Sequence, residues 1–254
     1  CMDFALQGQR VLVTGGASGI GRAIAEAFGK CGAHVVLTYF TSKDAAGETV
    51  ANIEASEGRA LALYADLTRE AEVEGVVAKM VEHFGGIDVL VANTGGLLKR
   101  SKVVDCSLEL WNQALAVNVT STFLCCRTVL PYMERAGRGC IITISSLAAH
   151  DGGGAGATHY AASKGAILTF TRALAKEVGP AGIRVNGIAP GLIATRFHDI
   201  FSTPEGRQAT VNRTPLRREG LPEDVAGAVL FLASPHASFL AGETIEVNGG
   251  QGVF

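Results

Sequence analysis

Short runs of aliphatic and β-branched residues alternate with longer amphipathic stretches along the whole chain, and this alternation restricts the fold more than any other feature of the sequence. The pattern predicts seven strands, at 10–14, 35–38, 60–64, 89–92, 140–144, 183–188 and 244–247. Helices are predicted between them, at 21–30, 43–57, 69–84 and 108–135, from about 160 to 179, and at 223–233. Strands that alternate with helices form a parallel sheet covered on both faces. With right-handed crossovers, the prediction is a doubly wound, Rossmann-type α/β fold.

The series runs through the chain without a linker, low-complexity segment or internal repeat, so residues 1–254 are predicted to form a single domain. A chain of this length can bury a full core. Cys1 precedes Met2, which has the place of an initiator methionine, so we expect Cys1 to be foreign to the natural protein.

Composition excludes several classes of function. The net charge of −2 and the lack of a basic block argue against a nucleic-acid partner. The sequence has no uncharged apolar run of about 18 residues and no secretory signal, so we expect no membrane span and a cytoplasmic location. The histidines lack the spacing of metal ligands, and no metal is expected. Five scattered cysteines without a C-x-x-C motif are expected to be reduced, namely Cys31, Cys106, Cys125, Cys126 and Cys140.

A glycine-rich turn, Thr14 to Gly21, joins the first predicted strand to the first predicted helix. Glycines there let the backbone approach a pyrophosphate, and the helix N-terminus offers free N–H groups and a positive dipole end. The spacing is G-x-x-x-G-x-G rather than the common G-x-G-x-x-G fingerprint. The turn therefore predicts a dinucleotide-phosphate site made by Gly15, Ser18, Gly19, Ile20 and Gly21.

Two further strand ends carry polar residues. Asp66-Leu67 closes the third strand, where the carboxylate could accept a bond from an adenine amino group or, alternatively, cap the next helix. Asn93-Thr94-Gly95 closes the fourth strand, and Asn93 is also expected to hold adjacent loops together. Because ligands bind at the carboxyl ends of strands in open α/β sheets, both segments are predicted to contact the dinucleotide.

Tyr160 and Lys164 indicate the chemistry most directly. Residues at i and i+4 share one face of a helix, so an ammonium group is expected beside the phenol. A neighbouring positive charge favours the phenolate and lowers a pKa that is ordinarily about 10. A tyrosine in that state could act as a general acid and base near neutral pH.

Taken together, these motifs resemble the short-chain dehydrogenase/reductase family in its compact, single-domain branch, including 3-oxoacyl-acyl-carrier-protein reductases and sugar or polyol dehydrogenases. The resemblance covers essentially the whole chain. Two departures concern Thr94, where the family usually has alanine, and the glycine-rich loop 147–159, which is about one residue longer than usual. The matching segments are 14–21, 93–95, Asn118, Ser146, Tyr160 with Lys164, 190–195 and 247–250.

The resemblance implies an oxidoreductase that interconverts a secondary alcohol and a ketone by hydride transfer with NADP or NAD. Tyr160 would exchange the proton with the substrate oxygen, and Lys164 would bind the nicotinamide ribose. Ser146 would hold the substrate oxygen, and Asn118 would anchor a water chain from Lys164. Ser145 is the rival to Ser146. Adjacent residues lie on opposite faces of a strand end, and the resemblance favours Ser146 as the one that faces the site.

The choice of dinucleotide depends on the end of the second strand. NAD enzymes usually carry an acidic residue there to bind the ribose 2′-hydroxyl, and this chain has none before Asp44. Hydroxyl and ammonium groups there could donate to a 2′-phosphate, although a lone Lys43 is a weaker partner than arginine. We therefore expect NADP to be preferred, with NAD as the alternative. The expected contacts are Tyr39, Phe40, Thr41 and Ser42, with Pro190, Gly191, Ile193 and Thr195 beside the nicotinamide.

Two substrate classes fit. The polar residues His150, Asp151 and His159 favour a sugar, sugar acid or polyol. The alternative is a 3-oxoacyl thioester on an acyl carrier protein, for which basic residues would supply a docking surface, namely Arg135, Arg138 and Lys176. A non-catalytic dinucleotide sensor is a remote third reading, which the intact Ser146, Tyr160 and Lys164 oppose.

Two loops and a set of helices complete the predictions. The polar segment 192–220 is expected to be an irregular substrate lid. In the loop 96–102, basic residues could meet an acidic substrate or carrier, or simply be solvated, namely Lys99, Arg100 and Lys102. A homotetramer is expected through helix 108–135, the Tyr160 helix and the last strand, with Phe123, Leu168 and Phe170 as apolar contacts.

Overall fold

A computed structural model describes residues 4–56 and 58–254, so Cys1 and Met2 lie outside the described residues. The seven predicted strands are present and form one sheet in the order β3-β2-β1-β4-β5-β6-β7, with every pair parallel. This is the doubly wound order, in which the chain reverses direction across the sheet between β1 and β4. The strands are β1 Arg10–Val13, β2 His34–Tyr39, β3 Arg59–Tyr64, β4 Val89–Ala92, β5 Gly139–Ile144, β6 Ile183–Pro190 and β7 Thr244–Val247.

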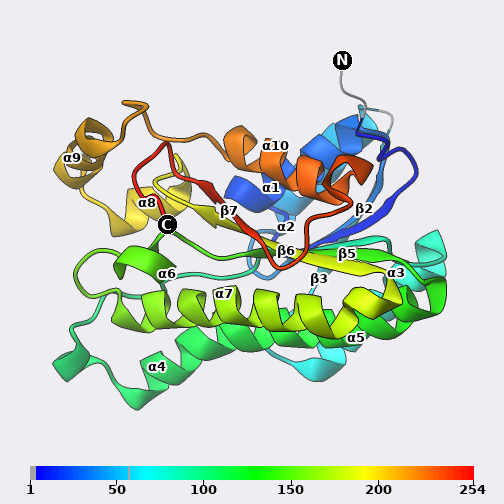
Figure 1. The fold of residues 1–254 in the computed structure, drawn as a ribbon, viewed down its shortest axis with the longest axis horizontal. Helices are drawn as coiled ribbons and strands as arrows, with labels where there is room; N and C mark the ends of the chain where they lie inside the picture. The colour runs from blue at the N-terminus through cyan, green and yellow to red at the C-terminus, as the bar shows by residue number, and fades with distance from the viewer. Residues whose placement is uncertain (1–3, 57) are drawn as a thin grey trace.

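Helices cover both faces of the sheet, as Figure 1 shows. One layer holds α1 (Gly19–Lys30), α2 (Lys43–Glu54) and α10 (Pro222–Ala233), and the other holds α3 (Glu70–Phe84), α4 (Leu108–Leu115), α5 (Ser121–Ala136) and α7 (Thr158–Val178). Because successive strand side chains point to opposite faces, Val11 and Val13 enter the core under α1, whereas Leu12 enters the core on the other side. The aliphatic side chains in both cores are almost completely buried.

The stretch 108–136 is the one candidate for a membrane span among the described residues, with a mean hydropathy of 1.3. It passes that test by length and composition alone, and 44% of its window is buried inside the fold. Its apolar residues Cys125, Val129 and Met133 belong to the core against the sheet. Part of the apolar surface of this stretch therefore belongs to the core.

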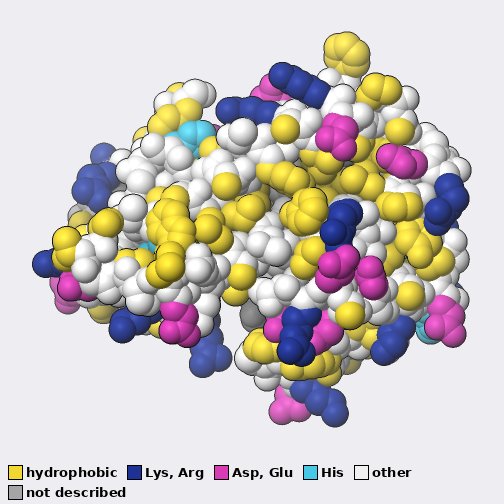
Figure 2. Space-filling view, turned by 90° about the horizontal axis from the view of Figure 1, so that it is seen from below, with side chains coloured by type: hydrophobic (Ala, Val, Ile, Leu, Met, Phe, Trp, Pro, Cys, Tyr) yellow, Lys and Arg dark blue, Asp and Glu magenta, His cyan; other side chains and the backbone are white. Residues whose placement is uncertain are grey.

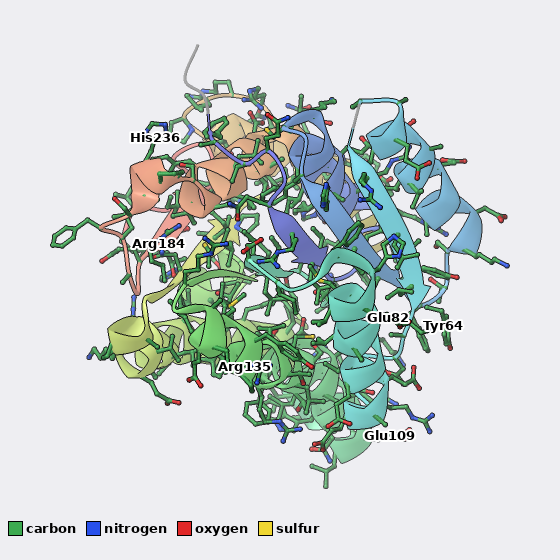
Figure 3. All side chains as sticks on the ribbon, turned by 90° about the vertical axis from the view of Figure 1, so that its right-hand side faces the viewer. Tyr64, Glu82, Glu109, Arg135, Arg184 and His236 are labelled. Carbon is green, nitrogen blue, oxygen red and sulfur yellow. The ribbon has the colours of Figure 1, made fainter. Side chains whose placement is uncertain are left out.

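The amino-terminal end of the sheet, which faces the viewer in Figure 3, is closed by polar contacts. Arg184 at the start of β6 donates to the carbonyl oxygens of Leu232 (2.7 Å) and Ala237 (3.1 Å). These carbonyls belong to the end of α10 and the following 3₁₀ turn, Pro235–Ala237, where a helix has unpaired acceptors. Arg10 forms an ion pair with the buried Asp88 at 2.7 Å. This end of the sheet is thus a structural base, and the opposite end is left for ligands.

Segment 192–220 differs from the irregular loop that we predicted. It forms α8 (Arg196–Phe201) and α9 (Pro204–Arg213), and a parallel bridge between Ile193 and Gly220 closes its base. The signal for α9 was present in the sequence, since Thr203 caps the helix through its hydroxyl and Pro204 occupies the first turn. We therefore describe this segment as a two-helix excursion with a narrow neck. Shorter elements are α6 (Ala148–Asp151) and the 3₁₀ turns Val103–Asp105 and Gly179–Ala181.

Candidate active site

The glycine-rich turn and the end of β4 are locked together by hydrogen bonds. The Thr14 hydroxyl accepts from the backbone N–H groups of Asn93 and Thr94, both at 2.9 Å. The Asn93 side-chain amide donates to the carbonyl oxygens of Thr14 (2.9 Å) and Gly15 (3.3 Å). Asn93 therefore holds the adjacent loops, as the sequence predicted, and it fixes the backbone at the switch point of the sheet.

Glycine at position 21 is required by the close approach of the first helix to this turn. A Cβ there would lie 2.2 Å from the Gly15 carbonyl oxygen and 2.6 Å from the Asn93 amide nitrogen. Gly15 and Gly19 have φ values of 63° and 52°, which favour glycine. The Ser18 side chain makes no capping bond, and the first residues of α1 line the cavity. This cradle fits the pyrophosphate of a dinucleotide.

Tyr160, Lys164 and Ser146 converge on one cavity of about 840 Å³ at the carboxyl ends of the strands. The Lys164 ammonium nitrogen lies 5.9 Å from the centre of the Tyr160 ring, so the predicted shared helical face is present. The Ser146 hydroxyl is hydrogen-bonded to the Tyr160 side chain. Ser145 points the other way, because its hydroxyl donates to the Lys164 carbonyl oxygen at 2.8 Å. Ser146 is therefore the serine that faces the phenol.

The predicted lowering of the Tyr160 pKa was wrong. Burial raises the pKa of Tyr160 above its ordinary value, and the hydrogen bond with Ser146 opposes the rise. Burial also lowers the pKa of Lys164 to about 8, and its ammonium group donates to the Ile144 carbonyl oxygen at 2.8 Å. The sequence argument allowed for the charge of the lysine but not for the removal of both groups from water. In this state Tyr160 is protonated at neutral pH.

Asn118 lies behind the cavity wall, in a π-helical turn, Ala116–Thr120, that interrupts the predicted helix between α4 and α5. Its amide donates to the carbonyl oxygens of Gly96 (3.0 Å) and Ala114 (2.9 Å), and its carbonyl oxygen accepts from the Gly96 N–H at 2.9 Å. The two amide hydrogens are thus both committed to the protein. A Cβ at Gly95 would lie 2.5 Å from this oxygen and 3.0 Å from the Lys164 nitrogen, so the three groups are in close contact.

The cavity separates the predicted site residues into two groups. Most of the phosphate and nicotinamide residues line it, namely Gly15, Ser18, Gly19, Ile20, Gly21, Asn93, Thr94, Gly95, Pro190, Gly191, Ile193 and Thr195, with Ser146, Tyr160 and Lys164. Outside the lining are Tyr39, Phe40, Thr41, Ser42, Asp66 and Leu67, together with Asn118. The ends of β2 and β3 are more open. There Phe40 stacks on Tyr64, with ring centres 5.8 Å apart, near the edge of the sheet where Figure 3 labels Tyr64.

The structure excludes one of the two alternatives for Asp66. Helix α3 begins at Glu70 after Arg69, so Asp66 is not its N-cap. Instead the Asp66 carboxylate accepts from the backbone N–H (3.0 Å) and hydroxyl (2.6 Å) of Thr68, which makes a local turn. One carboxylate oxygen is used in this turn, and the adenine contact stays a prediction.

Two of the three polar residues that favoured a hydroxylated substrate are turned away from the cavity. His159 is buried, and its ring nitrogen Nε2 lies 3.0 Å from the Leu97 carbonyl oxygen. His150 pairs with Glu246 at 3.0 Å and stacks on Phe254. Only Asp151 lines the cavity. Their positions in sequence beside Ser146 and Tyr160 could not show which way the side chains turn.

Several lid residues that line the cavity were missing from the sequence-based prediction of the site. The ring of Phe197 lies 6.0 Å from that of Tyr160 and 5.0 Å from that of Phe201. His198 also lines the cavity, and burial, with a contribution from Arg207, lowers its pKa to about 4. The aromatic i, i+4 pair 197/201 was the available signal. Among the described residues, no group of three or more histidine, cysteine or acidic side chains could hold a metal ion.

Comparison with known proteins agrees with this geometry. The sequence profile of a family described as Enoyl-(Acyl carrier protein) reductase matches residues 15–251. Glucose 1-dehydrogenase 2 of Bacillus subtilis is 37% identical over 98% of this chain and 96% of its own length. A 3-oxoacyl-[acyl-carrier-protein] reductase of Synechocystis is 37% identical over 98% of this chain and 99% of its own length. A structure of 7α-hydroxysteroid dehydrogenase with NADH and 7-oxo glycochenodeoxycholic acid has a TM-score of 0.93 and 38% identity, covering 98% of this chain and 96% of that one.

The fold and cavity define a dinucleotide-dependent oxidoreductase of alcohols and ketones. With these matches, the chain belongs to the short-chain dehydrogenase/reductase family, whose members use NAD or NADP. When bound, the nicotinamide supplies or accepts the hydride.

Proposed function

We propose that this enzyme interconverts a secondary alcohol and a ketone on a sugar, sugar acid or polyol, with Tyr160 as the group that exchanges the proton. The observation that carries the proposal is the convergence of Tyr160, Ser146 and Lys164 on the cavity beside the glycine cradle. For reduction, the protonated phenol gives its proton to the carbonyl oxygen that Ser146 holds. For oxidation, the phenol must first lose a proton, and Lys164, with its pKa near 8, is the adjacent group that can relay it.

Roles for the supporting residues follow from their contacts. We propose that Lys164 also holds the ribose of the nicotinamide half, because its ammonium group is buried beside Gly95 at the cavity wall. Asn118 positions the 95–96 backbone against Lys164, and any water chain from the lysine would have to use oxygen atoms of Asn118, since both amide hydrogens are donated within the protein. Residues 192–220 act as the substrate lid. Support comes from their narrow neck and from the packing of Phe197 against Tyr160.

The second candidate is reduction of a 3-oxoacyl group on an acyl carrier protein, which the name of the Synechocystis relative favours. The basic residues that we considered for carrier docking give it little support within one chain. Lys176 is near the end of α7 and Tyr160 near its start, so about 24 Å of helix separates them at 1.5 Å per residue. Arg135 and Arg138 lie near the same amino-terminal end of the sheet, and Figure 3 labels Arg135 there. We therefore place the small hydroxylated substrate first.

A spectrophotometric screen tests the ranking. Sugars, aldonates and polyols would be offered in parallel with 3-oxoacyl thioesters, and the absorbance of the reduced nicotinamide would be followed with each cofactor. The proposal predicts turnover of at least one hydroxylated compound with a kcat/KM above that of every thioester. A higher kcat/KM on thioesters would make the carrier-linked reaction the function.

We also propose a preference for NADP, argued from this chain rather than from its relatives. Thr41 and Ser42 stand at the end of β2 with their hydroxyl oxygens 3.5 Å apart, and Lys43 begins α2. No carboxylate that would repel a 2′-phosphate comes before Asp44, in the first turn of α2. The dehydrogenase structure with NADH shows that close relatives include enzymes that bind the other dinucleotide.

A homotetramer in the cytoplasm completes the proposal. Figure 2 shows apolar side chains gathered in patches on the face formed by α4, α5 and α7. Of the three residues suggested as contacts, Phe123 is exposed, but Leu168 is buried within its own chain and Phe170 packs against the core. The interface argument therefore rests on Phe123 and on the exposed Leu108 and Trp111. Sedimentation velocity at micromolar concentration should give a tetramer, and a stable monomer would refute it.

A further inference from the structure

The cavity carries more positive charge than its neighbours neutralise, although the whole chain has a net charge of −2. Besides Lys164, its lining includes four arginines and only one acidic residue, Asp151, and the arginines are Arg100, Arg196, Arg207 and Arg213. Arg207 is neutralised by Glu219 and Asp199, each 2.6 Å from it. The other three arginines have no carboxylate partner among the described residues. A cavity of this kind favours an anionic ligand.

The dinucleotide phosphates account for only part of this charge. Arg196 follows Thr195, whose methyl carbon would lie 3.5 Å from a Cβ at Gly19, so Arg196 is near the phosphate cradle. Arg100 belongs to the other side. Its Nε donates to the Phe201 carbonyl oxygen at 2.9 Å, and its Nη1 donates to the Ala155 carbonyl oxygen at 2.7 Å. These partners belong to the lid and to the loop before Tyr160, which together enclose the substrate side.

The backbone around Arg100 is fixed by several contacts. The Lys99 N–H donates to the Leu97 carbonyl oxygen at 2.8 Å across Leu98, whose φ of 65° gives a γ-turn that is rare for a residue other than glycine. The same carbonyl oxygen contacts the ring nitrogen of the buried His159 at 3.0 Å. The Ser101 N–H donates to the Gly156 carbonyl oxygen at 3.0 Å. Arg100 therefore lies on a turn that these hydrogen bonds hold in place.

The guanidinium of Arg100 has donors to spare. Of the five N–H groups of an arginine, two are donated to the carbonyl oxygens of Ala155 and Phe201, and three remain for a ligand. Its positive charge is felt nearby, since it contributes to the low pKa of His198. Arg100 contacts the Phe201 backbone, and the Phe201 ring packs against Phe197, which in turn packs against Tyr160, so these lid residues connect Arg100 to the phenol.

We propose that Arg100 binds a carboxylate at the far end of the substrate, so that this enzyme acts on sugar acids rather than on neutral sugars or polyols. This inference rests on the proposed function and selects one class within it. A charge-assisted pair between guanidinium and carboxylate gives both affinity and orientation. The same contact joins the lid to the loop before Tyr160, so an acidic substrate reinforces the closed arrangement.

A matched pair of substrates tests the proposal, because gluconate and sorbitol differ only in a carboxylate against a hydroxymethyl group. We would measure kcat/KM for both, and for further aldonates with their alditols, in the wild type, R100Q and K102Q. K102Q is the control, since it removes an exposed positive charge from the same loop as Arg100 but outside the cavity lining. Wild type should prefer the acid, and R100Q should lower the acid-to-alditol ratio by about ten- to a hundredfold, mostly through KM. K102Q should leave the ratio within about threefold.

Each other outcome has a definite meaning. An equal loss of kcat/KM on both substrates in R100Q would mean that Arg100 only holds the lid against the loop before Tyr160. A higher KM for the dinucleotide with an unchanged acid-to-alditol ratio would mean that Arg100 binds the cofactor instead. Either result, or a wild type that turns over alditols but no acid, would overturn the inference and leave the proposed function standing. Turnover of neither class with either cofactor would overturn the proposed function, and this inference with it.

Discussion

Replacing Lys164 with methionine should alter how the free energy of unfolding depends on pH, because Lys164 is buried and its pKa is lowered by desolvation. The Lys164 side chain is 4% exposed, and its pKa falls from 10.5 to about 8 because the charged form is desolvated. Methionine has a similar length and does not titrate. It also removes the hydrogen bond to the Ile144 carbonyl oxygen, which both the ammonium group and the neutral amine can donate.

The sign follows from the proton count of the two states. Below pH 8 the lysine is charged in both the folded and the unfolded protein, and the folded state bears the full cost of desolvation. Between pH 8 and 10.5 the folded lysine is neutral while the unfolded lysine still holds its proton, so the stability of the wild type rises with pH. At about 1.4 kcal/mol per pKa unit the full effect is roughly 3 kcal/mol, most of which is recovered between pH 7 and pH 10.

Urea denaturation of the wild type and K164M at several pH values, at one protomer concentration, measures this directly. Other titrating groups cancel in the difference between the two proteins. The free energy of unfolding of the wild type relative to K164M should increase by about 2–3 kcal/mol from pH 7 to pH 10. Curves that stay parallel to within about 0.5 kcal/mol would refute the claim that Lys164 is held in a desolvated state.

Two further predictions concern the dinucleotide. Gly21→Ala should raise the KM of the dinucleotide by about tenfold or more, because the new Cβ would lie 2.2 Å from the Gly15 carbonyl oxygen. The control Gly47→Ala, at a position on α2 with open space around it, should leave this KM unchanged. Equal effects of the two substitutions would contradict the role of the glycine-rich turn in dinucleotide binding. On one substrate, kcat/KM should be higher with NADP than with NAD, and a ratio above about ten in favour of NAD would overturn the preference argued from the end of β2.

Much of the fold could be predicted because its signals are local. The strand that includes Val11, Leu12 and Val13 is buried on both faces, so it appears in the sequence as a continuous apolar run. The cradle could be predicted for the same reason, since Gly21 and Asn93 follow strand ends that a parallel sheet must bring together. The short helices of the lid were missed although Thr203 and Pro204 carried a capping signal.

The parts that could not be predicted depend on contacts between distant segments. The π-helical turn at Asn118 is accompanied by hydrogen bonds between the Asn118 side chain and the Gly96 backbone. The spacing of apolar residues along a helix gives no sign of such contacts with a distant loop. Whether the pKa of Tyr160 is raised or lowered depends on how completely the fold removes the phenol from water. The contacts of Arg100 with Phe201, about a hundred residues away in sequence, appear only when the lid is folded.

The central claim is that Tyr160 transfers the proton while the cofactor exchanges the hydride. The most direct measurement is kcat of Tyr160→Phe on the best substrate of the screen, with dinucleotide affinity measured by fluorescence titration as the control for folding. Because positioned proton transfer contributes about 10²–10⁴-fold, kcat should fall by at least a hundredfold while the affinity for the dinucleotide stays within about threefold. A variant that keeps more than about a tenth of the wild-type kcat would contradict the account.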